Sequence, residues 1–563
     1  MKINLYFIIF LFLVPFNLLA QNFENSDYIQ LENLKPESLF KIGTETNSND
    51  PILINIFEKK SFEEIFDFMN HLPTKGNNYV IHELVKKILN SNYNLEGIEL
   101  NEKEDTQLFE IRINKLFDIA GFKEIDRIYS STPSNINNEN INLKRIEAYF
   151  LRNEYKNACD LLNKEKFQKS YVFGKFEIIC NIINQDFDKA RFNLALLKEI
   201  NEPGNNLFID LCYSIMGDVK ISKPEVMSER LDKISVLNPI LLSSLQIAEI
   251  SPNFEHIKNS PTSFLTFILG SPSSSIEVKL YTAETLVKQR RIDNSMLAEI
   301  YQLIVFEPEE ISNALNRYKA LSPVRARSLL YQALINEKNK TIKFQIVKTL
   351  LTHAKQDRLF INLSFLIKDT IKFHELENLL IDDIKLIIDI FSATKSFEDA
   401  EEFLKIKAYE NGILAKEFAE KEISLNLHRY IEDKSYFNLS QIEYLLDKIQ
   451  SQKEYDNEKE NILLISSIIF DFNEKIVSKI QEISATDLVE KSNMKLFDLI
   501  VGLSSIEKKD YFNSLKIIFR IFKDKKINEL SELELFLVLK FLMVFEYDAE
   551  FKYMVNEILF YKK

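Results

Sequence analysis

The sequence predicts an all-α protein, built as an α-solenoid of stacked antiparallel helix pairs. Glycine occurs only 10 times and proline 13 times in 563 residues, whereas sheet-rich and nucleotide-binding folds use glycine freely in turns and phosphate loops. A helix-turn-helix pattern also recurs at a fixed spacing between residues 140 and 222. Past residue 50 no long Pro-, Ser- or Gly-rich linker divides the sequence. A chain too long for one hydrophobic core is therefore expected to extend as a stack of helices.

Residues 1–20 predict a signal peptide. Lys2 provides a short basic start, an apolar run follows, and the small Ala20 precedes Gln21, as in a secretory signal with its cleavage site. We expect cleavage before Gln21 and export, with the periplasm as the destination. The alternative is an uncleaved anchor, because about eighteen mostly apolar residues nearly span a bilayer.

Residues 21–50 predict an extended or partly disordered arm. They contain polar runs such as ENSD and ETNSND and few periodic apolar positions, so they lack the apolar stripe of a packed helix. We expect Leu31, Leu34 and Leu39 to dock on the first helices. The remaining chain is expected to form N-terminal helical repeats over residues 51–260 and irregular C-terminal repeats over residues 261–563.

The clearest internal repeat consists of three segments spaced 32 residues apart. In each, a residue that tolerates a turn precedes an acid, and an apolar residue, two variable positions and a small residue follow. The acid suits the positive start of the second helix of a hairpin, and the small residue lets two helices approach closely. The order and spacing are similar to those of degenerate tetratricopeptide repeats. The turn and packing positions are Asn153, Tyr155 and Ala158, then Gln185, Phe187 and Ala190, then Gly217 and Ser222.

Beyond residue 222 the fixed spacing is lost, but signals of helices continue. Three prolines stand beside a cap-like residue or an acid and suit the first helical position, so they predict helix starts at Ser260-Pro261, Glu307-Pro308 and Ser322-Pro323. Amphipathic segments of about three turns lie between short polar connections. These segments are Ser275–Val287, Val324–Ile335, Thr341–His353 and Phe397–Tyr409.

Composition argues against two classes of function. The formal net charge of −13 disfavours nucleic-acid binding, which needs a basic face to neutralise phosphates. The most apolar stretch after the signal, Leu535–Phe545, has eleven residues and contains Lys540, whereas a membrane span needs about twenty. We therefore expect no transmembrane span in the mature chain, and this stretch predicts a helix buried against other helices.

Several blocks of sequence resemble a group of exported helical-repeat proteins of Gram-negative bacteria. The blocks are CNIINQDFDKARFNLALLKE at Cys180 to Glu199, FEPEEISNAL at Phe306 to Leu315 and SPVRARSLLYQAL at Ser322 to Leu334. The group is sometimes named antifreeze glycopeptide polyprotein, but this chain has none of the short Ala- and Thr-rich repeats of antifreeze glycopeptides. The resemblance therefore implies a compartment and a fold, and it supplies no catalytic residue.

Three cysteines in an exported chain suggest a disulfide. Cys180 and Cys212 occupy equivalent positions on successive first helices, so their side chains should point in parallel directions, which disfavours a bridge. Cys159 and Cys180 fall on consecutive antiparallel helices at similar heights. A disulfide between Cys159 and Cys180 would leave Cys212 as a buried free thiol. The alternative is that all three cysteines are small buried residues.

No group of residues predicts a catalytic, metal or cofactor site. The six histidines are scattered, and His82-Glu83 and His374-Glu375 lack the second histidine that a zincin helix needs. The segment Gly270-Ser271-Pro272 lacks the G-x-S-x-G elbow of hydrolases, so we interpret it as part of a loop that caps the helix beginning near Ser275.

Two further sets of residues have ordinary structural explanations. Asp382-Asp383 and Asp389 are expected to form a solvated helix face. Phe62, Phe66 and Phe68 lie at helical spacing and are expected to pack in the core. The alternative for these phenylalanines is an apolar concave stripe that binds a partner peptide.

Two functions of different classes fit the sequence. The first is a non-enzymatic periplasmic scaffold that binds a protein or peptide of the cell envelope along a curved helical surface, in envelope assembly or maintenance; a chaperone-like role for exported chains has the same sequence features. The alternative is a peptidoglycan-active enzyme similar to lytic transglycosylases, which combine an α-solenoid with a lysozyme-like domain. The second is disfavoured because Gly502 is the only glycine in residues 430–563, and a lysozyme-like cleft needs Gly-rich turns.

Overall fold

The regular elements in the described part of the chain are all helices, which confirms the all-α class. The computed structural model describes residues 38–44, 51–74, 78–132, 138–164, 171–200, 205–218, 237–252, 254–258, 260–410, 418–433, 447, 457–469, 496–523 and 525–562. The chain divides into two units, Met1–Ser38 and Leu39–Lys563. The expected signal peptide and most of the expected arm, Leu31 and Leu34 included, lie outside the described residues.

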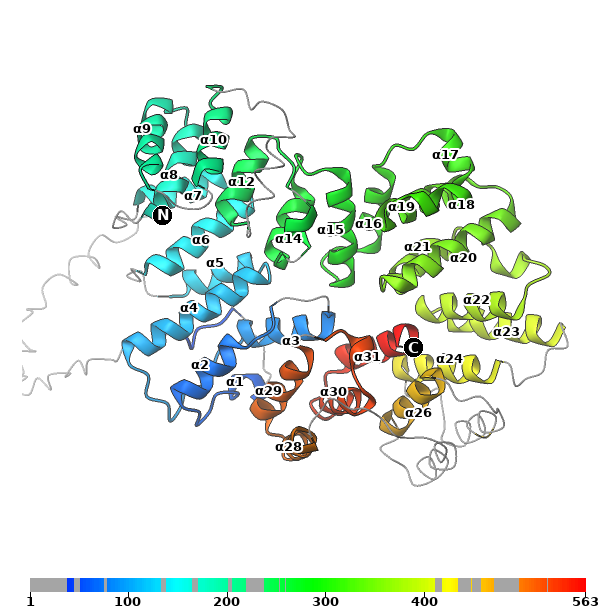
Figure 1. Ribbon diagram of the computed structural model, residues 1–563. Coiled ribbons are helices and arrows are strands. Elements are labelled where there is room, and N and C mark those ends of the chain that lie inside the picture. Colours follow the sequence, from blue (N-terminus) through cyan, green and yellow to red (C-terminus); the bar gives the residue numbers. More distant parts are fainter. Residues whose placement is uncertain are drawn as a thin grey trace, which may run out of the picture. The chain divides into compact units, whose positions relative to one another are not determined.

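The N-terminal helices run from α1 to α14 (Figure 1). Most of them contact the helix that precedes or follows them, as in the pairs α6 with α7 and α8 with α9. Their bounds are α1 Pro51–Ile54, α2 Phe62–Asn70, α3 Tyr79–Asn90, α4 Glu102–Asp118, α5 Phe122–Ser130, α6 Glu139–Leu151, α7 Tyr155–Lys164, α8 Tyr171–Ile183, α9 Phe187–Lys198, α10 Asn205–Ile215, α12 Pro239–Ile247, α13 Phe254–Ile257 and α14 Thr262–Gly270.

The C-terminal helices continue this pattern of neighbours, for example in α19 with α20 and α22 with α23. Their bounds are α15 Ile276–Lys288, α16 Asn294–Gln302, α17 Pro308–Ser312, α18 Ala314–Arg317, η1 Tyr318–Ala320, α19 Pro323–Asn336, α20 Lys340–Gln356, α21 Phe360–Ile367, η2 Phe373–Glu375, α22 Ile381–Ala393, α23 Phe397–Glu410, α24 Ala419–Glu432, α26 Asn457–Ile469, α28 Leu496–Glu507, α29 Tyr511–Phe522, η5 Ile527–Glu529, α30 Glu532–Val544 and α31 Asp548–Tyr561. The four amphipathic segments expected from the sequence correspond to α15, α19, α20 and α23, which confirms them as helices.

The expected helix starts at prolines are confirmed, with one shifted by a residue. Pro308 and Pro323 are the first residues of α17 and α19, where the missing N–H of proline costs no hydrogen bond. Pro261 is instead the residue before α14, with extended backbone at φ −65° and ψ 159°. The helix therefore begins at Thr262, one residue later than expected.

One type of turn links helices throughout the chain. Asn153, Gln185 and Gly217 have left-handed backbone, with φ of 61°, 63° and 77°. In each turn the next residue donates its N–H to a carbonyl five residues earlier, for example Asp186 to Asn181 over 2.8 Å. This bond satisfies a carbonyl that the end of the helix would otherwise leave unpaired. Ser222, the small residue of the third segment, lies outside the described residues.

The same turn occurs beyond the three segments that the sequence identified. Ala120 and Glu249 also have left-handed backbone and lie 33 residues before Asn153 and 32 residues after Gly217. A nearly constant spacing therefore extends from Ala120 to Glu249. The turn recurs without that spacing at Arg290, Arg358, Lys395, Lys509 and Glu546.

The apolar side chains of the described residues form two clusters. The smaller cluster lies mainly on α6 to α10 and contains Ala158 and Ala190, both fully buried, with Tyr155 and Phe187 packed against it. The larger cluster covers most of the other helices. It includes the apolar stretch near the C-terminus, where Leu535, Leu537 and Phe541 of α30 are fully buried, as expected for a helix enclosed by protein. In the described part of the chain, no helix combines the length and the apolarity needed to cross a membrane.

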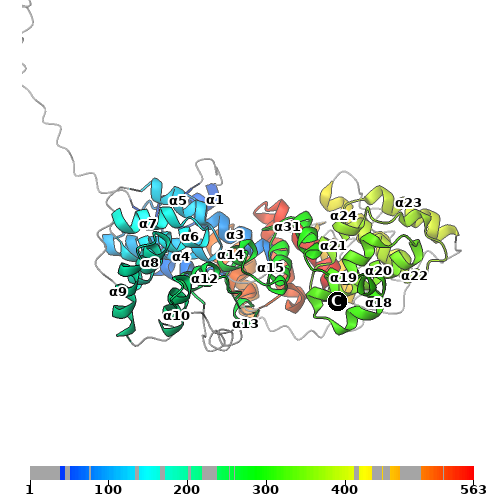
Figure 2. The same ribbon diagram turned by 90° about the horizontal axis from the view of Figure 1, so that it is seen from above.

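Helices near the start and the end of the unit Leu39–Lys563 pack against each other. Figures 1 and 2 both place α31 beside α3, and Lys87 of α3 forms a 2.6 Å ion pair with Glu550 of α31. Nearby, the ring of Phe68 in α2 stacks on Phe512 of α29 at 4.8 Å between centroids. Segments more than 400 residues apart in the sequence are thus in direct contact.

The end of the expected arm is bound to these helices. Leu39 and Phe40 donate backbone N–H groups to the carboxylate of Asp105 over 2.7 and 3.1 Å. The fully buried Arg112 donates to the carbonyls of Phe40, Leu89 and Ser91, so its charge is surrounded by acceptors. Leu39 packs against the larger apolar cluster, in agreement with the docking expected for it.

Candidate functional site

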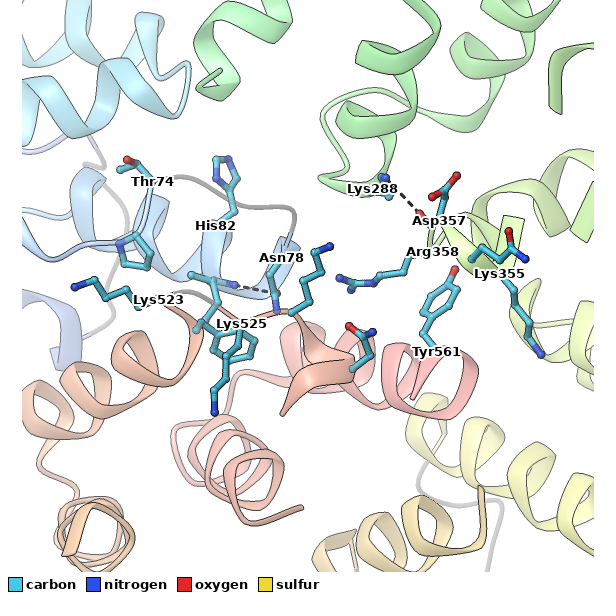
Figure 3. Close-up of a pocket in the computed structure, with 16 residues that line it drawn as sticks. Thr74, Asn78, His82, Lys288, Lys355, Asp357, Arg358, Lys523, Lys525 and Tyr561 are labelled. Atoms are coloured by element: carbon cyan, nitrogen blue, oxygen red, sulfur yellow. Dashed lines mark hydrogen bonds between the residues drawn. The ribbon is translucent and has the colours of Figure 1, made fainter. Parts of the chain in front are cut away.

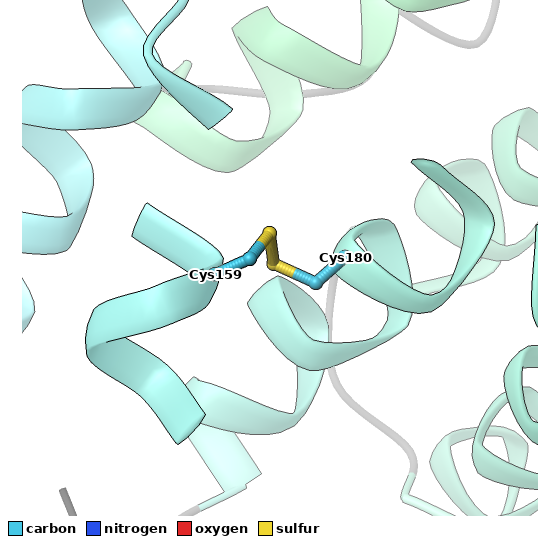
Figure 4. Close-up of a disulfide and its surroundings, with 2 residues drawn as sticks. All are labelled: Cys159 and Cys180. Carbon is cyan, nitrogen blue, oxygen red and sulfur yellow. A yellow bond between two sulfur atoms is a disulfide. The ribbon is translucent and has the colours of Figure 1, made fainter. Parts of the chain in front are cut away.

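Cys159 of α7 and Cys180 of α8 form a disulfide in the structure (Figure 4). Their sulfur atoms are 1.98 Å apart and their Cα atoms 5.6 Å apart. Both residues belong to the smaller apolar cluster. Cys212, on α10, is a buried free thiol, and burial raises the pKa of that thiol well above its usual range. The reactive thiolate form is therefore suppressed at Cys212.

The expectation for the aspartates of α22 was wrong. Asp382 is exposed, but Asp383 and Asp389 are only 6% and 8% exposed. Asp383 pairs with Lys348 at 2.5 Å and Asp389 with Lys421 at 3.0 Å. These carboxylates therefore join α22 to α20 and α24 and do not form a solvated face.

The phenylalanines of α2 are only partly in the core. Phe68 is 2% exposed, whereas Phe66 is 36% exposed. Phe62 is partly buried against the larger cluster and contacts Phe66, with ring centroids 5.4 Å apart. The expectation of core packing is therefore confirmed for Phe68 and wrong for Phe66.

A polar cavity of about 410 Å³ lies where segments from both ends of the chain meet (Figure 3). Asn78 and His82 line it from the start of α3, Lys288 from the end of α15, and Tyr561 from the end of α31. The end of α20 and the turn that follows contribute Lys355, Asp357 and Arg358, and the segment between α29 and η5 contributes Lys523, Lys525 and Lys526. We call this the basic cavity.

The positive charges of the basic cavity are only partly balanced. Arg358 pairs with Glu557, Lys525 with Glu534 at 2.6 Å, and Lys355 with Asp389 at 3.7 Å. Among the described residues, the side chains of Lys288, Lys523 and Lys526 are in no salt bridge. Lys288 donates instead to the backbone carbonyl of Asp357 over 3.3 Å. Among the described residues, the only carboxylate that lines the cavity is that of Asp357, which is bound to Arg327 at 2.6 Å.

Three residues that line the cavity each have a buried side-chain nitrogen without a hydrogen-bond partner in the described structure. These atoms are Nδ2 of Asn78, Nε2 of His82 and Nε of Arg358. The side-chain oxygen of Asn78 caps α3 by accepting from the N–H of Val80 over 2.9 Å, which leaves its amino group for another acceptor. The unpartnered atoms of Asn78 and Arg358 are hydrogen-bond donors. The unpartnered Nε2 of His82 is also a donor when it carries the ring proton.

Burial lowers the pKa of two groups in the cavity. His82 is 5% exposed, and burial, followed by the nearby charges of Arg291 and Lys86, lowers its pKa to about 3. The imidazole is thus neutral near pH 7. Burial also lowers the pKa of Lys288, because removing an ammonium from water disfavours the charged form.

A second surface feature is an apolar stripe on α9. Ala190, Leu194 and Leu197 face the smaller cluster, whereas Phe192 and Leu196 on the other side are 63% and 49% exposed. Ile200, four residues after Leu196, is 38% exposed. Positions 192 and 196 lie one helical turn apart on the same side of α9, and Ile200 follows two residues after the last residue of the helix. We call Phe192, Leu196 and Ile200 the α9 stripe.

Neither feature was predicted as a site from the sequence. The run KDKK at Lys523 to Lys526 is a local cluster of positive charge, and three of its residues line the basic cavity. Among the described residues, no group of three or more His, Cys, Asp or Glu side chains is arranged to hold a metal ion.

Comparisons with known proteins give no relative. No protein-family model, no curated protein and no solved structure matches the chain.

Proposed function

We propose that the protein is an exported, periplasmic α-solenoid scaffold, without enzymatic activity, that binds a protein of the cell envelope. The partner is proposed to contribute an amphipathic helix that covers the α9 stripe. The observation that carries this function is the exposure of Phe192 and Leu196. Large apolar side chains in a row at one-turn spacing are typical of surfaces that bind an apolar helix face.

The dimensions of the α9 stripe suit such a partner. Phe192 and Leu196 are four residues apart, which corresponds to about 6 Å along α9, and Ile200 continues the stripe just beyond the end of the helix. Apolar residues one turn apart on a partner helix have the same spacing as Phe192 and Leu196. Arg191 beside the stripe is bound to Asp218 over 2.8 Å, so this neighbour of Phe192 is held by the turn that follows α10.

The recurrent turn supports a solenoid of tetratricopeptide-like repeats. A nearly constant spacing from Ala120 to Glu249, with the same backbone conformation in every turn, is the regularity that stacked helix pairs require. The disulfide between Cys159 and Cys180 supports export, because disulfides persist in oxidising compartments such as the periplasm. Residues 1–20 would provide the signal for that export.

Site-specific photo-crosslinking tests this function. A photoreactive phenylalanine analogue would replace Phe192 or Leu196 in cells that express the full chain. Asp188 lies on the same helix with a fully exposed side chain and is the matched control position. We expect one adduct of defined mass from positions 192 and 196, and none from position 188. The double variant Phe192→Ser/Leu196→Ser should lose co-purification of the crosslinked protein.

Two results would contradict the proposal. Equal crosslinking from positions 188, 192 and 196 would mean that no partner recognises the stripe. Recovery of the full-length chain, uncleaved and with reduced cysteines, from the cytoplasmic fraction would refute export.

A further inference from the structure

We propose that the basic cavity binds a small phosphate-bearing anion, namely a phosphate ester of about the size of a sugar phosphate. The observation that carries this assignment is a single cavity that is lined by five lysines and one arginine and, among the described residues, by one carboxylate. It is independent of the partner proposed for the α9 stripe.

The charge of the cavity is opposite to that of the chain. The chain carries a formal net charge of −13, yet Lys288, Lys523 and Lys526 line the cavity and are in no salt bridge among the described residues. Glu284 and Asp357 attract Lys288 from beyond salt-bridge distance. Repulsion among these ammonium groups and the partial burial of Lys288 both raise the free energy of the empty cavity. A bound anion reverses both effects, because it pairs with the lysines and restores the interactions that Lys288 has lost with water.

The side chains that line the cavity are mainly hydrogen-bond donors. Its lysines and Arg358 have no acceptor atom in their side chains, and buried polar atoms without a partner, which are rare in folded proteins, occur in three of its lining residues. Asn78 and Arg358 offer donors only, because the oxygen of Asn78 is already used in capping α3. The neutral imidazole of His82 donates in its Nε2–H tautomer. The cavity therefore matches a molecule rich in acceptor oxygens.

The positions of the donors favour phosphate over carboxylate. Figure 3 shows His82 and Asn78 on the α3 side, Lys288 and Arg358 on the opposite side, and Lys523 and Lys525 on the side of α29. A phosphate group presents its oxygen atoms tetrahedrally, whereas the two oxygens of a carboxylate share one plane. Donors that surround a site from several elements therefore fit the tetrahedral group better. The cavity volume of about 410 Å³ leaves room for the organic part of an ester.

Titration calorimetry on the purified full chain tests the assignment. The ligands are inorganic phosphate, a hexose 6-phosphate, the unphosphorylated hexose and citrate, each at low and at high salt. We expect the hexose phosphate to bind most tightly and inorganic phosphate more weakly. The free hexose should give no binding heat. Affinity should fall with added salt, because screening weakens attraction between charges.

Variants of the cavity rim connect binding to these residues. Lys523 and Lys526 are exposed, so Lys523→Gln/Lys526→Gln should fold normally. This double variant is expected to bind the hexose phosphate roughly tenfold more weakly, whereas Lys523→Arg/Lys526→Arg keeps the charges and should bind within about threefold of the unaltered chain. The control Lys103→Gln/Lys338→Gln removes two exposed lysines that do not line the cavity and should leave affinity unchanged.

Several outcomes would overturn the assignment. The absence of saturable binding of both phosphate ligands at low salt would remove the anion site. Citrate binding as tightly as the hexose phosphate would remove the preference for phosphate. Equal loss of affinity in the cavity variant and in the control would show that only the net charge of the chain matters. None of these measurements depends on crosslinking at the α9 stripe, so the two proposals fail separately.

Discussion

Replacing Arg327 with methionine tests whether a buried charge cluster holds α15, α16 and α19 together. The side chain of Arg327 is 1% exposed. Its guanidinium donates to both oxygens of Glu284, over 2.8 and 2.6 Å, and Tyr301 donates its hydroxyl to the same carboxylate over 2.8 Å. Burial disfavours the charge on Arg327, but the neighbouring acids outweigh it and raise the pKa of this guanidinium above its usual range.

The expected cost follows from what the substitution leaves behind. Methionine fills most of the space of the arginine stem, so the main effect is a buried Glu284 carboxylate that keeps only the Tyr301 hydroxyl as a donor. Breaking a buried pair in this way costs about 3–5 kcal/mol. Asp357, the other partner, is 44% exposed, so its lost contact adds less than about 1 kcal/mol. We expect Arg327→Met to destabilise these helices by about 3–4 kcal/mol at pH 7.

Hydrogen exchange read by mass spectrometry measures this cost locally. Some amides of α15 and α19 exchange their hydrogens only when these helices open. Their exchange rates should rise by about a hundredfold or more, since each 1.4 kcal/mol lost from the opening free energy corresponds to a factor of ten. Peptides from α9, which lies in the other apolar cluster, are the internal control and should not change.

The double variant Glu284→Gln/Arg327→Met separates a buried charge from simple loss of packing. Removing both charges should restore most of the stability, because a neutral amide in place of the carboxylate leaves no unpaired ion. The reasoning is refuted if the double variant is as unstable as Arg327→Met. It is also refuted if Arg327→Met changes the opening free energy by less than about 1 kcal/mol.

Three further predictions address the turns, the disulfide and a buried histidine. Cys159→Ala/Cys180→Ala should lower stability by about 3 kcal/mol, as expected for a disulfide that closes a loop of about twenty residues; an unchanged thermal midpoint would contradict this. Gln185→Gly should raise the free energy of unfolding by about 0.5–1 kcal/mol, because glycine adopts left-handed backbone without strain. Ala195→Gly, on the exposed side of α9, should lower the free energy of unfolding by about 1 kcal/mol. Denaturation midpoints that shift in the same direction for both variants would refute the explanation. His82 has a pKa lowered to about 3, so below pH 6.5 the unfolded chain binds more protons, and stability should fall by up to about 1.4 kcal/mol per pH unit. His82→Gln should reduce this slope in denaturation curves measured between pH 7 and pH 5, and an identical slope would refute the assignment.

Local chemistry made the helices predictable from the sequence. Ser275 accepts from the N–H of Val278, and a short polar residue before an amphipathic run is a signal that the sequence contains in full. Pro323 likewise suits only the first turn of a helix. Pro261 shows the limit of this signal, because proline is equally compatible with the extended residue before a helix, and tertiary packing decides between the two positions.

The repeat was only partly visible because its turn depends on backbone geometry more than on side-chain identity. Asn153, Gln185 and Gly217 precede an acid, and this pattern identified them. Ala120 and Glu249 form the same turn but precede Gly121 and Ile250. Left-handed backbone costs a non-glycine residue about 1–2 kcal/mol, and burial of the helices on either side outweighs that cost. A pattern of residue types therefore misses turns that packing alone imposes.

The error at α22 has a related cause. The sequence places Asp383 and Asp389 on a helix, and acids on a helix are usually solvated. Their actual environment is decided by Lys348 of α20 and Lys421 of α24, which approach from other helices. Helical periodicity describes a single helix and contains no information about the charge on its neighbours.

The basic cavity could not be predicted from the sequence for the same reason, because its lining side chains come from segments far apart in the chain. Its lysines that are in no salt bridge among the described residues come from positions 288, 523 and 526, and they converge only because the end of α15 and the segment between α29 and η5 border the same cavity. Charges interact appreciably within a Debye length of about 8–10 Å at moderate ionic strength. The potential inside a cavity therefore depends on the few groups that line it, and an average over 563 residues does not describe it. An acidic composition argues against a broad basic face for nucleic acid, yet it is fully compatible with one cavity where a small anion is attracted.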